Sequence, residues 1–237
     1  MPSHASRVLI TGASRGLGLE FARQWLAEGH QVIALARNPD ASPGLRQLQA
    51  EHDQNLQVFA CDVADDEAVG RTAVAVRSQS AALDLVVNNA GRFQERRGTV
   101  DNMDFDNALR TFNVNALGPL RVSRAFIPLL RRGFEPKLVH ITSLMGSIAD
   151  NRSGGAYAYR MSKAALNMAS RNLAIELQEY GIPSVVLHPG WVQTEMGGPS
   201  ATLSVEESVR GLRQVIAGLK PEDSGRFLNW KGEECPW

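Results

Sequence analysis

The chain has 237 residues, and its 25 lysine and arginine residues balance 25 aspartate and glutamate residues, so the formal net charge is zero. Because no basic run stands out, the charge pattern disfavours nucleic acid and anionic membranes as partners. The apolar runs are only as long as strands, so we expect no membrane-spanning segment, and residues 1–7 lack the apolar stretch of a secretory signal.

Strand-like and helix-like segments alternate along the chain, and its length is enough to bury the core of one α/β domain. We therefore predict a single doubly wound Rossmann fold, with a parallel sheet of about seven strands and helices on both faces. The expected strands are residues 8–11, 31–36, 57–60, 83–88, 137–143, 184–188 and 226–229. The expected helices are residues 17–28, 65–79, 115–132 and 157–180, with a late helix after a capping box at Ser204 and Glu207.

A glycine-rich loop follows the first predicted strand directly and opens the first predicted helix. Gly12 permits a tight turn, Gly16 lets the backbone approach a pyrophosphate, and Gly18 allows close packing of helix on sheet. The N-terminus of the helix would then face the phosphates. A plain strand–turn–helix is the alternative, but the strand before and the helix after favour dinucleotide binding.

Tyr159 and Lys163 lie four residues apart in a predicted helix, and Ser143 lies near the end of an earlier apolar run. Positions four apart share one face of a helix, so Lys163 should hold its ammonium beside the Tyr159 hydroxyl. A nearby cation favours the phenolate, so we expect the pKa of Tyr159 to be lowered toward neutral pH. An exposed lysine above a packed ring is the alternative, and the glycine loop argues against it.

The two cysteines and five histidines give no sign of a disulfide framework or a metal site. Cys61 and Cys235 are expected to be inert thiols in a reducing compartment, which predicts a cytoplasmic protein. The histidines are scattered along the chain, and we interpret His188, beside Pro189, as a packed residue at the end of a strand.

Six motifs occur in a characteristic order: Thr11-Gly12-x-x-x-Gly16-x-Gly18, Asn88-Asn89-Ala90-Gly91, Asn115, Ser143, Tyr159-x-x-x-Lys163 and Pro189-Gly190-x-Val192-x-Thr194. This ordered set resembles the short-chain dehydrogenase/reductase family, and the match covers essentially the whole chain. Residues 157–160, 188–192 and 196–198 resemble a narrower group, the C-factor and sniffer-like carbonyl reductases. The interval from Ser143 to Tyr159 is longer than is usual in the wider family, a trait that the narrower group shares.

The resemblance implies a catalytic tetrad of Asn115, Ser143, Tyr159 and Lys163. Tyr159 would give a proton to a carbonyl oxygen while the nicotinamide delivers hydride to carbon, and Ser143 would hold that oxygen. Lys163 would hold the nicotinamide ribose, and Asn115 would anchor a water that relays protons to Lys163. Taken singly, Ser143 could be a strand-end hydroxyl, Asn115 a helix residue bonded to backbone, and Tyr157 the packed ring.

The second predicted strand is followed by Arg37 with no acid nearby, whereas a fold that prefers NAD usually offers a carboxylate to the adenosine ribose. Arg37 and Arg15 fit a 2′-phosphate, which predicts NADP(H) as the cofactor; two solvated arginines are the alternative. By resemblance, Asp62 contacts the adenine and Thr194 bonds the carboxamide. The expected cofactor residues are Gly12, Ser14, Arg15, Gly16, Leu17, Gly18, Arg37, Asp62, Val63, Asn89, Ala90, Gly91, Tyr159, Lys163, Pro189, Gly190, Val192 and Thr194.

The substrate pocket should be walled by Phe93, Leu144, Met145, Trp191 and Met196, whose side chains are apolar and adaptable. They suit a small-molecule carbonyl substrate, an aldehyde, ketone or quinone-like compound, without choosing among these. We therefore predict an NADPH-dependent carbonyl reductase. The alternative is an NADP-binding signalling or sensor protein of C-factor type with little turnover.

Two further expectations concern a lid and a partner subunit. By resemblance, residues 194–203 form a substrate lid in which Gly197 and Gly198 act as a hinge and Met196 and Leu203 close over the substrate. An ordered surface connection is the alternative. Members of the family commonly associate through the two helices that correspond to residues 115–132 and 157–180, so the resemblance predicts a homodimer or homotetramer. Six apolar residues in those helices could serve either the core or a partner: Leu120, Ile127, Leu130, Leu166, Leu173 and Leu177.

Overall fold

The computed structural model describes residues 5–94 and 98–237, so residues 1–4 of the segment predicted to lack a signal lie outside the described part. Its seven strands form one parallel sheet in the order β3-β2-β1-β4-β5-β6-β7. The strands are β1 Arg7–Thr11, β2 Gln31–Ala36, β3 Leu56–Ala60, β4 Leu85–Asn88, β5 Lys137–Ile141, β6 Ser184–His188 and β7 Phe227–Asn229. This order is that of a doubly wound sheet with its switch between β1 and β4, as the sequence predicts.

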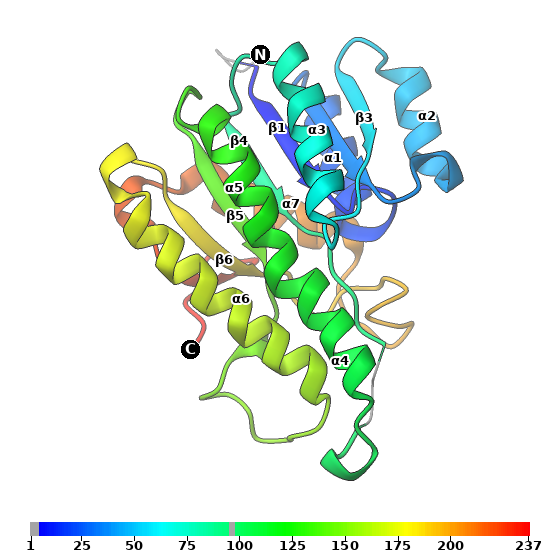
Figure 1. Ribbon diagram of the computed structural model, residues 1–237, viewed down its shortest axis with the longest axis vertical. Coiled ribbons are helices and arrows are strands. Elements are labelled where there is room, and N and C mark those ends of the chain that lie inside the picture. Colours follow the sequence, from blue (N-terminus) through cyan, green and yellow to red (C-terminus); the bar gives the residue numbers. More distant parts are fainter. Residues whose placement is uncertain (1–4, 95–97) are drawn as a thin grey trace.

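The helices cover both faces of the sheet (Figure 1). They are α1 Gly16–Ala27, α2 Pro43–Glu51, α3 Asp66–Gln79, α4 Phe105–Phe112, α5 Gly118–Leu130, α6 Tyr157–Glu176 and α7 Val205–Gly218. The 3-10 turns are η1 Pro39–Ala41, η2 Val100–Asn102, η4 Leu144–Gly146, η5 Gln178–Tyr180 and η6 Pro221–Asp223. Asp65 and Ser204 cap α3 and α7 through their side-chain oxygens, as predicted.

Two apolar cores lie on opposite faces of the sheet. Alternate residues of β1 serve them, since Val8 and Ile10 belong to one core and Leu9 to the other. The first core packs α1, α2 and α7 on the sheet, and in it the rings of Phe21 and Trp25 stack with centroids 5.0 Å apart. The second packs α3, α5 and α6. Burial on both faces explains why the strands are continuous apolar runs.

The structure differs from several of the predicted elements. The helix expected at residues 115–132 begins earlier, as α4, and reaches α5 through a π turn at Asn113–Leu117. A π turn holds an additional residue, which a search for 3.6-residue periodicity does not detect. Helix α2 was not predicted; Ser42 caps it and Pro43 starts it. Strand β5 ends at Ile141, because Ser143 already caps η4.

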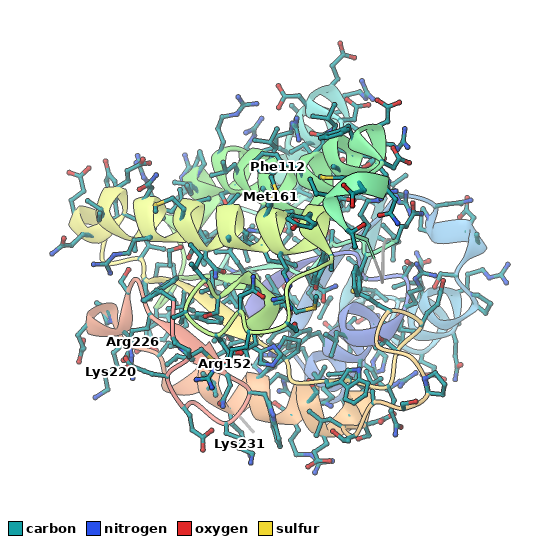
Figure 2. All side chains as sticks on the ribbon, turned by 90° about the horizontal axis from the view of Figure 1, so that it is seen from below. Phe112, Arg152, Met161, Lys220, Arg226 and Lys231 are labelled. Carbon is teal, nitrogen blue, oxygen red and sulfur yellow. The ribbon has the colours of Figure 1, made fainter. Side chains whose placement is uncertain are left out.

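The outer surface of α5 and α6 carries exposed apolar side chains. Of the six apolar residues considered for a partner, Leu130, Leu166, Leu173 and Leu177 are buried in the protein's own core, Ile127 is partly buried against it, and Leu120 is exposed. Other exposed apolar residues were not predicted: Leu117 at the end of the π turn before α5, and Met161, Met168 and Ile175 of α6. Figure 2 shows Met161 of α6 near Phe112 of the adjacent helix α4. We call the exposed residues 117, 120, 161, 168 and 175 the α5/α6 apolar surface.

None of the helices in the described part of the chain has the length and apolar character needed to cross a membrane. Across residues 5–94 and 98–237, no three or more His, Cys, Asp or Glu side chains gather in a way that could hold a metal ion. Cys61 and Cys235 are free thiols. Burial raises the pKa of Cys61 and raises that of Cys235 to about 11, so both are protonated at neutral pH.

A buried polar chain crosses the sheet beneath the site described below. His140 of β5 is fully buried; its Nδ1 lies 3.2 Å from Asn88 Nδ2 and its Nε2 3.4 Å from Ser184 Oγ. Since the NH₂ group of the Asn88 side chain can only donate, Nδ1 accepts and Nε2 carries the proton. Burial, with a smaller effect of the Lys163 charge, lowers the pKa of His140 to about 3.

This neutral histidine makes stability depend on pH. The unfolded chain has a histidine pKa of about 6.5, so between pH 6.5 and 3 only the unfolded state binds the proton, and stability falls as the pH is lowered. Relative to His140→Gln, the unmodified protein should lose about 1.4 kcal/mol of unfolding free energy per pH unit in this window. Urea unfolding of both proteins at pH 7 and pH 5 measures this. An equal loss in both would contradict it.

Candidate active site

The carboxyl ends of β1 and β4 meet in direct backbone contact. A Cβ atom on Gly12, where φ is +66°, would lie 2.8 Å from Ala90 Cα. One on Gly18 would lie 2.3 Å from the Gly12 carbonyl oxygen. Gly16, with φ at +53°, lies against the Thr194 methyl group. The close approaches at Gly12 and Gly18 and the positive φ at Gly16 require glycine, and these contacts bring the glycine loop, the turn after β4 and the segment after β6 together.

Hydrogen bonds fix the same junction. The Thr11 hydroxyl oxygen accepts from the Asn89 and Ala90 backbone N–H groups, both at 3.0 Å. The Asn89 side-chain amide donates to the carbonyls of Thr11 and Gly12, at 2.9 and 3.2 Å. Asn89, predicted as a cofactor residue, therefore holds the backbone of the glycine loop in place through the Thr11 and Gly12 carbonyls.

Tyr159 and Lys163 are both buried on the inner face of α6. Only 7% of Tyr159 is exposed against 39% of Tyr157, so Tyr159 is the packed ring. The Lys163 ammonium donates to the Ile141 carbonyl oxygen at 2.9 Å and lies 5.7 Å from the centre of the Tyr159 ring. The pair is therefore close, but the ammonium is directed at the end of β5.

The predicted direction of the Tyr159 pKa shift is wrong. Burial raises the pKa of Tyr159 to about 12, and a hydrogen bond with the Ser143 side chain opposes that rise only in part. Burial also lowers the pKa of Lys163 to about 8. Desolvation disfavours the charged form of each group, and it is the largest effect on both pKa values. Tyr159 is thus a protonated phenol at neutral pH.

Asn115 sits fully buried in the π turn between α4 and α5. Its Oδ1 accepts from the Arg92 backbone N–H at 2.8 Å, and its Nδ2 donates to the Arg92 carbonyl oxygen and to Ser162 Oγ, at 2.9 and 3.0 Å. These bonds match the backbone-bonded alternative for Asn115. They hold the turn after β4 beside Lys163, since a Cβ on Gly91 would lie 3.8 Å from Lys163 Nζ. A water relay through Asn115 stays a prediction.

Ser143 caps the short turn η4 by accepting from the Met145 backbone N–H at 3.2 Å. This turn packs on α6, because a Cβ on Gly146 would lie 2.8 Å from Lys163 Cβ. Asn167 of α6 donates to the Gly146 carbonyl oxygen at 3.3 Å and accepts from the Thr142 hydroxyl at 2.6 Å.

Three side chains that support the site were not predicted in this role: Ser162, Asn167 and His188. His188 Nδ1 accepts from the Leu144 backbone N–H at 3.3 Å. For Ser162 and Asn167, helical spacing from Tyr159 and Lys163 could have indicated a place on the same helix face. Ser162 and Asn167 stand three residues after Tyr159 and four after Lys163, on the same face of α6.

The residues expected near an adenosine ribose follow β2 and β3. Arg37 is exposed just after β2. Arg15 is exposed too, but its guanidinium pairs with the Glu195 carboxylate. This ion pair was not predicted, since Arg15 was expected either to bind the 2′-phosphate or to be solvated. Asp62 Oδ1 accepts from the Ala64 backbone N–H at 2.9 Å, and Val63 is buried.

The remaining expected cofactor residues are Ser14, Leu17, Pro189, Gly190 and Val192. They belong to the glycine loop, to the first turn of α1 and to the segment after β6. The Pro189 carbonyl oxygen accepts from the Ser208 hydroxyl at 2.7 Å. The Ser14 carbonyl oxygen accepts from the Ser42 hydroxyl at 2.6 Å. These bonds connect the glycine loop to Ser42, the N-cap of α2, and the segment after β6 to α7.

Of the predicted pocket residues, Phe93 contacts Tyr159 directly, and the others differ in how far they are buried. The Phe93 ring stacks on the Tyr159 ring, with centroids 4.4 Å apart. Leu144 and Met145 are half-buried in η4. Trp191 and Met196 are exposed, and the Trp191 indole donates to the Gly197 carbonyl oxygen at 3.0 Å.

Leu203 and Gly197 make packing contacts in this structure, and their roles in a lid stay a prediction. Leu203 is buried, and its backbone forms a bridge with Val192. A Cβ on Gly197 would lie 1.9 Å from the Val192 carbonyl oxygen, so close backbone approach accounts for this glycine. Thr194 caps the segment by accepting from the Gly197 N–H at 3.0 Å. Residues 194–203 thus form a bonded turn with both ends attached.

A comparison with known protein families matches residues 6–202 to the short chain dehydrogenase family. This chain belongs to the short chain dehydrogenase family. The C-signal of Myxococcus xanthus is 54% identical over 155 residues, which cover 65% of this chain and 93% of that protein. The 1-hydroxy-2-glutathionyl-2-methyl-3-butene dehydrogenase of Rhodococcus sp. (strain AD45) is 34% identical over 98% of this chain and 100% of its own.

Solved structures of the short chain dehydrogenase family share the whole fold. The NADPH-bound carbonyl reductase from chicken fatty liver superposes with a TM-score of 0.90 and 36% identity, covering 99% of this chain and 100% of that one. The carbonyl reductase Sniffer of D. melanogaster has a TM-score of 0.94 and 31% identity, with the same coverage. The sheet order and the single domain of this chain are therefore those of a carbonyl reductase-like member.

The contact between Gly18 and the Gly12 carbonyl predicts a loss of stability on adding one methyl group. Gly18→Ala should lower the unfolding free energy by about 1–3 kcal/mol, because the glycine loop must shift. Gly70→Ala is the control, since a Cβ there meets nothing within 4 Å. It should stabilise α3 by about 0.5–1 kcal/mol. Thermal unfolding measures both; similar midpoints for the two variants would contradict the packing role.

Proposed function

We propose that this protein is an NADPH-dependent oxidoreductase that reduces the carbonyl group of an aldehyde, ketone or quinone-like small molecule to an alcohol. The observation that carries the proposal is the buried, protonated Tyr159 hydrogen-bonded with Ser143 beside Lys163. Two carbonyl reductases of like fold support it: that from chicken fatty liver, solved with NADPH bound, and one from Pseudomonas aeruginosa PAO1, solved in complex with NADP.

The residues of the site fit NADP(H). The glycine loop presents backbone without side chains at Gly12 and Gly16, which is the surface that a pyrophosphate needs at a helix N-terminus. Arg37, exposed after β2, would take the 2′-phosphate at the adenosine end of the cofactor. Thr194, which lies against Gly16, would bond the carboxamide at the nicotinamide end. When bound, the nicotinamide supplies hydride.

Tyr159 acts as the proton donor in this proposal. Its raised pKa keeps the phenol protonated until a carbonyl oxygen gains charge, and the proton then passes from the Tyr159 hydroxyl to that oxygen. Ser143 holds the same oxygen through its hydroxyl, and the Lys163 ammonium stabilises the tyrosinate that remains. Phe93, stacked on Tyr159, limits the entry of water to the reacting atoms.

The signalling or sensor alternative rests on the C-signal relative. The complete set of Asn115, Ser143, Tyr159 and Lys163 favours an enzyme, because a sensor has no need of a buried proton donor. NADPH consumption with a panel of aldehydes, ketones and quinones distinguishes them. Tight nucleotide binding without turnover of any compound would favour the sensor.

Removing one oxygen atom tests the proton donor. Tyr159→Phe should abolish turnover and leave NADPH affinity nearly unchanged, because the lost hydroxyl acts on the substrate. Tyr157→Phe is the matched control, since Tyr157 is exposed two residues away, and it should retain the full rate. Steady-state kinetics and fluorescence titration of NADPH give the two readouts. Near-normal kcat in the Tyr159→Phe variant would show that another group donates the proton.

Cofactor preference tests the arginines. Arg37→Ala should reduce the preference for NADPH over NADH by about tenfold to a hundredfold, as expected for charge-assisted hydrogen bonds to the 2′-phosphate. Arg15→Ala should have the smaller effect, because Glu195 already pairs with Arg15. The ratio of kcat/KM for the two cofactors decides this. Equal use of both cofactors by the unmodified enzyme would mean that neither arginine reads the phosphate.

Residues 194–200 are proposed as the part of the predicted lid that responds to ligands. The ends of the segment are fixed by Val192 and Leu203, so its movement would be confined to the turn that carries Glu195 and Met196. Hydrogen exchange there should slow when cofactor and product bind together. Unchanged exchange would indicate a preformed pocket.

The α5/α6 apolar surface is proposed as a homodimer interface, since side chains such as Met168 and Ile175 are more than half exposed on it. Burying them against a second copy would remove apolar area from water. Sedimentation at micromolar concentration measures the mass. A monomer under these conditions would contradict the dimer.

A further inference from the structure

The hydrogen-bond ladder between β5 and β6 continues one step beyond the strands through a side chain. The last backbone bond runs from the Thr142 N–H to the Leu187 carbonyl oxygen, at 2.9 Å. The Leu144 N–H instead donates to His188 Nδ1, at 3.3 Å. The imidazole of His188 thus acts as the acceptor where η4 leaves the sheet.

This bond fixes the state of the ring. A backbone N–H can only donate, so Nδ1 must hold a lone pair and the proton of the neutral imidazole sits on Nε2. Burial lowers the pKa of His188 to about 4, which keeps the ring neutral at neutral pH. The acceptor is therefore present throughout the range in which the enzyme would work.

His188 holds the turn from the side opposite α6. On the α6 side, Gly146 packs on Lys163 and its carbonyl oxygen accepts from Asn167. On the β6 side, His188 is the one side chain among the described residues of that strand that bonds to η4. Ser143, in extended conformation with φ at −150°, lies between these two attachments.

We propose that His188 is a positioning residue of the reaction: by accepting the Leu144 N–H it sets the place of the neighbouring Ser143 hydroxyl relative to Tyr159. The inference rests on the proposed function, in which Ser143 holds the carbonyl oxygen. Small displacements of such a group cost rate because the hydrogen bond to the reacting atom depends steeply on geometry. His188 does not itself touch the reacting atoms in this role.

Two amide substitutions separate the hydrogen-bond acceptor at Nδ1 from the rest of the ring. In His188→Asn the side-chain oxygen takes the place of Nδ1, whereas in His188→Gln the oxygen lies one carbon farther out, near the place of Nε2. The Asn variant should keep kcat within about threefold, and the Gln variant should lose about tenfold to a hundredfold in kcat. NADPH affinity should be unchanged in both. Equal kcat for the Asn and Gln variants would overturn the inference.

A second pair of measurements shows whether the effect passes through Ser143. In a Ser143→Ala background, His188→Gln should cause almost no further loss in single-turnover NADPH oxidation, since the group it positions is gone. The Leu144 amide should exchange with solvent faster in the Gln variant and not in the Asn variant. Full additivity of the two losses, or unaltered exchange, would refute the positioning role.

The outcome for the unmodified enzyme separates the two hypotheses. If it turns over carbonyl compounds and His188→Gln does so equally well, the positioning role fails while the proposed function stands. If the unmodified enzyme turns over none, both fail. Unfolding midpoints of the two variants close to that of the unmodified protein exclude a general loss of structure.

Discussion

The hydrogen bonds of Asn89 and Thr11 are the constraint on which the site depends. They join the ends of β1 and β4, the strands between which the sheet changes direction, and they close the gap to backbone contact between Gly12 and Ala90. Loops diverge at such a switch point, which leaves room for a ligand above the sheet. These bonds fix the position of the glycine loop relative to the turn after β4.

Burial governs the chemistry of the two central groups. It moves the pKa of Tyr159 up and that of Lys163 down, so both shifts favour the uncharged form. A phenol that stays protonated is a suitable donor, and an ammonium that is easily deprotonated can exchange protons near neutral pH. The low-dielectric environment that disfavours the charged form of both groups also strengthens each hydrogen bond that they make.

Buried polar side chains hold the segments around Tyr159 and Lys163 in place. Asn115 ties the turn after β4 to α6 through Ser162, and Asn167 ties η4 to the end of β5. His188 closes the same frame from β6. Each of these groups is bonded at more than one point or to a backbone amide, which is how buried polar groups give a site one geometry.

The sequence by itself determined the sheet, the glycine loop and the family, because strand and helix periodicity, positive-φ glycines and ordered motifs are local properties of the chain. Tertiary structure alone decided the pKa of Tyr159, the pairing of Arg15 with Glu195 and the burial of Leu203. Each of these depends on groups distant in sequence. Desolvation and long-range pairing are set by how the segments pack in space, and no spacing along the chain encodes them.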